Sequence, residues 1–322
     1  MKQIAIVLIP LLALFQSDGS HAQLARQEFH SIPSASMSPA DFLTGKQGIP
    51  VMLAAELRLP KIGPGKQPAV VLLHGSSGPG GPGGIYDAWT KVLNEGGFAT
   101  FAIDSFAGRG IVNLPGDVGK LSPITRMVDV YSALKVLANH PMIDSSRIAV
   151  MGFSHGSPAA FYSNLVRFRK AHGHNDVQFA AHISVYGFCT VRYRDDETLA
   201  KPVLVLHGTA DDLLPIEPCR EYAARLSKAG NNVRLMEYPD AHHAFDMPQF
   251  SVALKLPEAP TPRRCRLTEG DNGLILNADT KQPFTPSDPC LEKGVTVAYQ
   301  EAAAKKSHED VKAFLKEALQ LK

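Results

Sequence analysis

Residues 147–156 read Arg-Ile-Ala-Val-Met-Gly-Phe-Ser-His-Gly, and this stretch decides the fold that the rest of the chain must complete. The largely apolar run 147–151 predicts a buried strand, and the Gly-x-Ser-x-Gly pattern after it predicts a sharp turn with Ser154 at the apex. Glycine at positions 152 and 156 leaves room for the turn, because side chains there would collide with the neighbouring strand and helix. A helix-compatible segment follows. The stretch predicts an exposed, nucleophilic Ser154; the alternative is a serine at an ordinary strand-end turn.

Nucleophilic chemistry needs two further groups, and the chain supplies candidates for both. A serine hydroxyl is a poor nucleophile at its own pKa, so a base must take its proton and an acid must orient that base. Asp211-Asp212 and His242-His243 each follow a separate apolar run that reads as a strand. Because loops after the strands of a parallel sheet converge on one edge, the order Ser, Asp, His predicts a catalytic triad.

The segment from Pro68 to Phe245 resembles the dienelactone hydrolase family of α/β-hydrolases, and the resemblance covers a little over half of the chain. Type members carry cysteine at the nucleophile position, whereas this chain carries serine, which favours an ordinary serine esterase over a true dienelactone hydrolase. The resemblance rests on His74-Gly75, Asp104-Ser105-Phe106, Ile143-Asp144, Gly208-x-x-Asp211-x-x-x-Pro215 and Tyr238-Pro239-x-Ala241-x-His243-x-Phe245.

This resemblance implies Ser154 as nucleophile, Asp211 as acid and His243 as base. The neighbouring Asp212 is then expected to be solvated or to cap the next turn. His242 is expected to line the substrate pocket or to face solvent. From the residues alone, Asp212 remains an alternative to Asp211 as the acid, and His242 remains an alternative to His243 as the base.

An acyl-transfer site also needs donors for the oxyanion. One is expected to be the backbone N–H of His155, after the nucleophile, and the other to come from the loop after strand 68–74. We assign the second donor to the Ser76 N–H, with Ser77 as the alternative. The resemblance further implies that Arg109 binds a substrate carboxylate; the alternative is a solvated or ion-paired loop arginine.

The N-terminus has the pattern of an export signal. Met1-Lys2 precedes an apolar run over 4–15 and then Ser20-His21-Ala22, so residues 1–22 predict a cleaved signal peptide, with an uncleaved anchor as the alternative. The mature protein is then periplasmic or secreted, and does not stay in the membrane. A net charge of +2 gives no indication of nucleic-acid binding or of an anionic membrane surface.

Four cysteines in an exported chain are expected to pair. Cys189 follows the strand 181–186, and Cys219 opens the helix after the Asp211 loop, so these two lie at the same sheet edge. We therefore expect Cys189–Cys219, which leaves Cys265–Cys290 to close a late insertion.

The chain alternates strands and helices as in an α/β-hydrolase fold, with a mostly parallel, doubly wound sheet and helices on both faces. An irregular arm is expected over 23–50, before one domain over 51–322. A Pro-rich insertion over about 250–294 is expected to form a disulfide-held flap beside His243 or a decorative excursion. Ser307 is the expected N-cap of the last helix. Strands are expected near 51–58, 68–74, 98–103, 147–152, 181–186, 202–207 and 233–238, and helices near 85–95, 124–139, 156–170, 217–229 and 307–320.

These features together predict hydrolysis of a small carboxylic ester or lactone through an acyl-enzyme. The reaction needs no cofactor. His172, His174 and His182 lack the spacing of a zinc site, so no metal is expected. The alternatives are a serine peptidase or acyltransferase with the same triad, and a non-catalytic binding module on the same fold.

Overall fold

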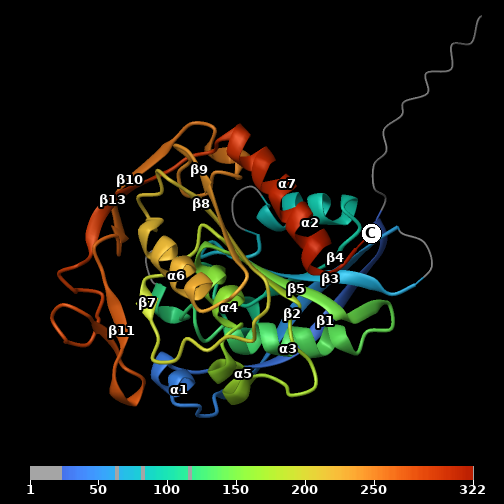
Figure 1. Cartoon of the computed structure of the whole chain (residues 1–322), viewed down its shortest axis with the longest axis horizontal. Coiled ribbons are helices and arrows are strands. Elements are labelled where there is room, and N and C mark those ends of the chain that lie inside the picture. The colour runs from blue at the N-terminus through green and yellow to red at the C-terminus, as the bar shows by residue number, and fades with distance from the viewer. Residues whose placement is uncertain (1–23, 62–64, 81–83, 115–117, 322) are drawn as a thin grey trace, which may run out of the picture.

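The centre of the protein is a mixed sheet of eight strands, seen in a computed structural model that describes residues 24–61, 65–80, 84–114 and 118–321 (Figure 1). Its strands are β1 (Leu24–Ser36), β2 (Ile49–Pro60), β3 (Gln67–Leu73), β4 (Ala99–Asp104), β5 (Ile143–Phe153), β6 (Ala181–Val185), β8 (Val203–Gly208) and β9 (Val233–Tyr238). They lie in the order β1-β2-β4-β3-β5-β6-β8-β9. Neighbours from β4 to β9 are parallel, and β1 and β2 pair antiparallel at one edge.

Helices cover both faces of this sheet, because its central strands are apolar on both sides. All seven residues of β3 are buried, as expected of a parallel strand enclosed between helices. Val71 belongs to the core on the face of α3, α4 and α6, whereas Val70 and Leu72 belong to the core under α2 and α7. This confirms the predicted fold. The helices are α1 (Pro39–Leu43), α2 (Ile85–Glu95), α3 (Met127–Ala138), α4 (Ser157–Tyr162), α5 (Val166–His172), α6 (Glu217–Lys228) and α7 (Glu301–Ala318).

The prediction of an irregular arm over 23–50 is wrong. Residues from Leu24 to Ser36 form the edge strand β1, paired with β2 along its length, and α1 follows it. Polar residues dominate β1, and it contains Pro33, so its sequence lacks the apolar run of a central strand. An edge strand tolerates both, because one side of its backbone has no partner strand.

The last helix also differs from its prediction. α7 begins at Glu301, six residues earlier than expected, and Gln300 is its N-cap. Ser307 lies buried inside the helix, where its hydroxyl donates to the Ala304 carbonyl at 2.8 Å. The hydroxyl is satisfied by the preceding turn, so it does not need a capping position.

The late insertion is built of short strands and lies outside the main sheet (Figure 1, orange). β10 (Leu254–Thr261) pairs with β13 (Glu292–Val297), and β11 (Leu267–Glu269) lies between β12 (Ile275–Asn277) and β7 (Val191–Arg192). Both predicted disulfides, Cys189–Cys219 and Cys265–Cys290, are present.

The predicted signal peptide, residues 1–22, lies outside the described residues. None of the helices in the described ranges combines the length and the apolar character that a membrane span requires.

Candidate active site

Ser154 occupies the turn that the opening stretch predicts, directly after β5. Its φ of 48° is in the left-handed region, which a residue with a Cβ rarely adopts. The flanking glycines allow a close approach of backbone segments. A Cβ at position 152 would lie 2.3 Å from the Gly156 carbonyl oxygen, and one at position 156 would lie 2.6 Å from the His74 carbonyl oxygen. Larger residues at either position would push the serine out of place.

The structure brings Ser154, His243 and Asp211 into one hydrogen-bonded chain. The Ser154 Oγ lies 2.9 Å from His243 Nε2, and His243 Nδ1 lies 2.8 Å from Asp211 Oδ2. These side chains come from loops after β5, β9 and β8, which meet at the carboxyl edge of the sheet as predicted. With Asp211 accepting from Nδ1–H, the unprotonated Nε2 of His243 is free to accept the serine proton.

Asp211 is a buried carboxylate whose charge is strongly supported. Its Oδ1 accepts the backbone N–H groups of Leu213 at 3.1 Å and Leu214 at 2.8 Å. Burial alone would raise the pKa of Asp211, but His243 and the hydrogen bonds from His207 and His243 outweigh it and hold this pKa well below its ordinary value. Asp211 therefore stays ionised throughout the neutral and mildly acidic range.

His207 is a neighbour of the triad that the sequence analysis missed. Its Nε2 lies 2.6 Å from the Leu214 carbonyl oxygen and 3.5 Å from Asp211 Oδ2, at the end of β8. It follows a buried strand as one residue of a Leu-His-Gly run, and that pattern carries no signal for contact with an acid four residues later.

The doubled residues separate clearly in space. Asp212 points away from His243, and its Oδ1 accepts the backbone N–H of Thr296 in β13 at 2.7 Å. The partly exposed Asp212 side chain thus binds β13, whereas Asp211 binds His243. His242 is half-buried beside the base, and its Nδ1 has no hydrogen-bond partner among the described residues.

The insertion fastens the loops that carry the acid and the base. The Thr261 hydroxyl donates to the Leu213 carbonyl at 2.7 Å, in the loop after Asp211. The Ala298 N–H donates to the His243 carbonyl at 3.2 Å, and the Gln300 N–H donates to the Phe245 carbonyl at 2.9 Å. The insertion is thus bound to the loop after Asp211, and the segment that follows β13 is bound to the loop that carries His243.

A buried group of polar side chains packs against the ring of His243. The Tyr186 ring lies 4.8 Å from the His243 ring, centroid to centroid, and the Tyr186 backbone has a φ of 37°. Its hydroxyl donates to Asp246 at 3.0 Å, and the Trp89 Nε1–H donates to the same carboxylate at 2.7 Å. Burial raises the pKa of Asp246. Sequence reasoning missed this group, because its three members lie far apart in the chain.

The loop after β3 is held in one orientation by the side chain of His74. The Ser105 N–H donates to His74 Nε2 at 3.2 Å, so the ring proton is on Nδ1, which donates to the Gly75 carbonyl at 2.7 Å. Since C=O and N–H point in opposite directions in a trans peptide, this bond also fixes the direction of the Ser76 N–H. A Cβ at position 75 would lie 3.4 Å from the Cβ of Ser154, which places this loop against the nucleophile.

Arg109 takes the ion-paired alternative rather than the substrate-binding one. Its guanidinium forms a bidentate pair with Asp129 at 2.7 and 3.0 Å, and both side chains are almost fully buried. The remaining donors bind the carbonyls of Ala35 and Ser105 and the hydroxyl of Ser36. All five N–H groups are used, so none is left for a substrate carboxylate.

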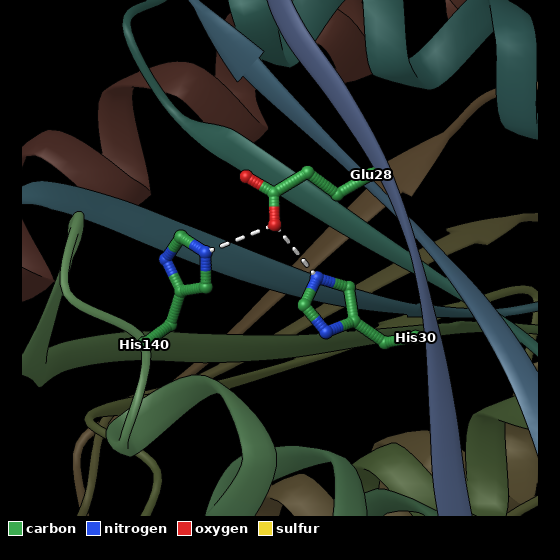
Figure 2. A group of neighbouring side chains, drawn as sticks. All are labelled: Glu28, His30 and His140. Carbon is green, nitrogen blue, oxygen red and sulfur yellow. Dashed lines mark hydrogen bonds and ion pairs between the residues drawn. The ribbon is translucent and has the colours of Figure 1, made fainter.

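Among the described residues, one group of side chains has the types and spacing that could hold a metal ion: Glu28 and His30 of β1, and His140. Figure 2 shows the rings of His30 and His140 directed at one carboxylate oxygen of Glu28, at 3.1 and 3.2 Å from their Nε2 atoms. The Met142 N–H donates to His140 Nδ1, so the proton of this ring is on Nε2. A metal on Nε2 would require a proton on Nδ1, facing that N–H. The arrangement fits a hydrogen-bonded fastening of β1.

Comparisons with known proteins agree with this geometry. The model of the dienelactone hydrolase family matches residues 53–319. The chain belongs to this family. It is therefore a hydrolase of esterase type with the α/β-hydrolase fold.

Two solved structures of dienelactone hydrolase type share the fold at 17% identity. A Klebsiella pneumoniae protein assigned as a dienelactone hydrolase has a TM-score of 0.56, over 90% of this chain and 99% of that one. A dienelactone hydrolase-like promiscuous phosphotriesterase from metagenomic libraries has a TM-score of 0.55, over 91% and 98%.

A similarity over part of the sequence links this family member to a much longer plant protein. Acylamino-acid-releasing enzyme 1 of rice (Oryza sativa subsp. japonica) is 24% identical over 226 residues, which is 57% of this chain and 28% of the rice enzyme. The chain thus spans little more than a quarter of that relative.

Proposed function

We propose that this protein is a serine esterase that cleaves carboxylic esters or lactones through an acyl-enzyme. The observation that carries the proposal is the pair of contacts around His243, 2.9 Å to Ser154 Oγ and 2.8 Å to Asp211 Oδ2. A serine, an imidazole and an ionised carboxylate in that order form the relay that acyl transfer needs.

In the proposed reaction, His243 Nε2 takes the proton of Ser154 as the Oγ atom attacks the substrate carbonyl. The negative charge on the carbonyl oxygen is accepted by the N–H groups of Ser76 and His155, and such a donor typically contributes about 3–4 kcal/mol. Asp211 stabilises the imidazolium. His243 then protonates the leaving alcohol, and water repeats the sequence on the acyl-enzyme.

Export is part of the proposal. It is supported by the N-terminal pattern over 1–22 and by two disulfides, since disulfides persist mainly in oxidising compartments. The expected location is the periplasm or the outside of the cell, and the expected partner is a small ester.

A serine peptidase of acylated peptides is the second candidate, and the similarity to the rice acylamino-acid-releasing enzyme favours it. A panel of p-nitrophenyl esters of increasing chain length, with a matched anilide and an acidic lactone, separates the candidates. We expect ester turnover that disappears in Ser154→Ala and little turnover of the anilide. Anilide turnover equal to that of the ester would favour the peptidase, and turnover that survives in Ser154→Ala would overturn both candidates.

A further inference from the structure

Arg126 is a fully buried cation directly behind the expected oxyanion site. It stands immediately before α3, and none of its surface is accessible to solvent. Among the described residues no carboxylate lies within ion-pair distance of its guanidinium, and its Nη2 has no hydrogen-bond partner. Burial lowers the pKa of Arg126 to about 10, so the group remains charged at neutral pH. A buried charge without a contacting counter-ion is costly and calls for an explanation.

The contacts of Arg126 join the two segments that carry the expected oxyanion donors. Its Nη1 donates to the His74 carbonyl at 2.8 Å, at the start of the loop that contains Ser76. The same atom lies 3.3 Å from Nδ1 of His155, whose own N–H is the other expected donor. One guanidinium nitrogen therefore ties the oxyanion loop to the nucleophile turn.

The side chain of His155 fits the role of a neutral acceptor in this link. Burial, with a further contribution from Arg126, lowers the pKa of His155 to about 3, so the ring carries no charge at working pH. Since Arg126 donates to Nδ1, the ring proton is on Nε2. The ring thus transmits position and adds no second positive charge.

The surrounding charges leave Arg126 less compensated than its neighbour Arg109. The charge of Asp129 attracts both arginines, but its two carboxylate oxygens are bound by the guanidinium of Arg109. Asp104 also attracts Arg126 from a distance, and Arg109 repels it. A positive potential therefore remains behind the loop, on the side where the carbonyl oxygen of a substrate would become negative.

We propose that Arg126 is a positioning residue for the oxyanion hole, which holds the Ser76 and His155 segments at a fixed separation and favours negative charge between them. This inference rests on the proposed esterase function. It assigns no contact between Arg126 and the substrate, because the guanidinium is sealed from solvent.

The test compares Arg126→Met and Arg126→Lys with the wild type. In Arg126→Met we expect kcat for a p-nitrophenyl ester to fall about 10- to 100-fold, with KM changed less than about threefold, because the lost effect concerns the transition state. Lysine keeps the charge, but its side chain is shorter and lacks the Nε–H that donates to the Ser105 hydroxyl at 3.3 Å, so Arg126→Lys should recover only part of kcat.

A trifluoromethyl ketone supplies the readout that a merely structural role would not change. This probe forms a tetrahedral adduct with an oxyanion, so its Ki should rise in parallel with the loss of kcat/KM across the series. The Ki of the matched methyl ketone, which forms little tetrahedral adduct and so places no full charge in the oxyanion hole, should stay constant. Circular dichroism at the assay temperature must show each variant folded.

Each outcome bears on one claim. If Ser154→Ala is inactive and folded Arg126→Met keeps wild-type kcat and ketone affinity, the positioning role is wrong and the esterase stands. If Arg126→Met does not fold, Arg126→Lys decides. Wild-type kcat and ketone affinity in Arg126→Lys would overturn the positioning role of the guanidinium. Activity that survives in Ser154→Ala removes the proposed function itself.

Discussion

The two sides of the candidate active site are held in place by different parts of the molecule. Ser154 and the loop after β3 are fixed from within the main fold, by the Gly152 and Gly156 approaches, the His74 ring and Arg126. Asp211 and His243 are fixed from outside it, by Thr261 and the segment after β13. The serine side thus depends on the core, whereas the acid and base side depends also on the insertion.

From this difference we expect the insertion and the segment after it to affect the site. Asp212 Oδ1 accepts the Thr296 N–H, and the segment after β13 bonds to the carbonyls of His243 and Phe245. The Asp211 loop and the His243 loop are therefore both bonded to the insertion or to the segment that follows it. Substitutions on one side of the site at a time test this difference.

The largest effect is expected from the base. His243→Ala should lower kcat by roughly 10⁴-fold or more, since no other group can take the serine proton. His242→Ala, the matched control, should cost less than about tenfold, because its ring makes none of the relay contacts. Ester hydrolysis by both purified variants measures the difference. A larger loss in His242→Ala would mean that the base has been assigned to the wrong histidine.

Substitutions of Asp211 and Asp212 should also differ strongly in their effect on kcat, as those of His243 and His242 do. Asp211→Asn removes the charge that orients His243, and a loss of about 10⁴-fold in kcat is expected. In Asp212→Asn the amide oxygen can still accept the Thr296 N–H, so the insertion stays attached and kcat should fall by only a few fold. Comparable losses in the two variants would contradict the separation of roles.

The disulfides allow a comparison of the core with the insertion. Cys189–Cys219 and Cys265–Cys290 close loops of 30 and 25 residues, so chain entropy gives both about 3–4 kcal/mol. We expect paired serine substitutions at 189 and 219 to lower mainly Tm, because Cys219 lies fully buried in α6, in the core cluster that also contains Cys189 and Cys265. The pair at 265 and 290 should lower kcat more for the same loss of Tm, because it loosens the supports of Asp211 and His243. Equal ratios of activity loss to Tm loss would show that the insertion does not support the relay.

The smallest expected effect is the dependence of the free energy of unfolding on pH. Burial lowers the pKa of His155 to about 3 and of His182 to about 4, against about 6.5 in the unfolded chain. Their stabilising contribution is complete above about pH 6.5 and is lost as the pH falls toward their folded values, by up to about 1.4 kcal/mol per pH unit for each ring. Asp211 adds nothing to this slope above pH 5, since its pKa is lowered. Urea unfolding at pH 7.5 and 5.0 measures the change in the free energy of unfolding between these two pH values. His182→Leu should show a shallower dependence; an unchanged slope would be evidence against a neutral buried ring.

The sequence predicted the parts of this protein whose chemistry is local. The turn at Ser154 follows from two glycines and a strand, and the positions of Asp211 and His243 follow from loops after separate strands. What it could not predict depends on contacts between distant segments. β1 was missed because an edge strand needs no apolar run, and Arg109 was left open because its partner Asp129 lies 20 residues away, with two further partners near residue 35. Arg126 and Tyr186 gave no signal, since only the fold shows that they are buried beside the site.

The most direct test of the central claim is the identity of the residue that a fluorophosphonate probe modifies. Intact mass measurement followed by peptide mapping should show one adduct, on Ser154, and almost none in Ser154→Ala or His243→Ala. Labelling of another serine, or undiminished labelling in His243→Ala, would contradict the account of a serine activated by the His243 and Asp211 relay.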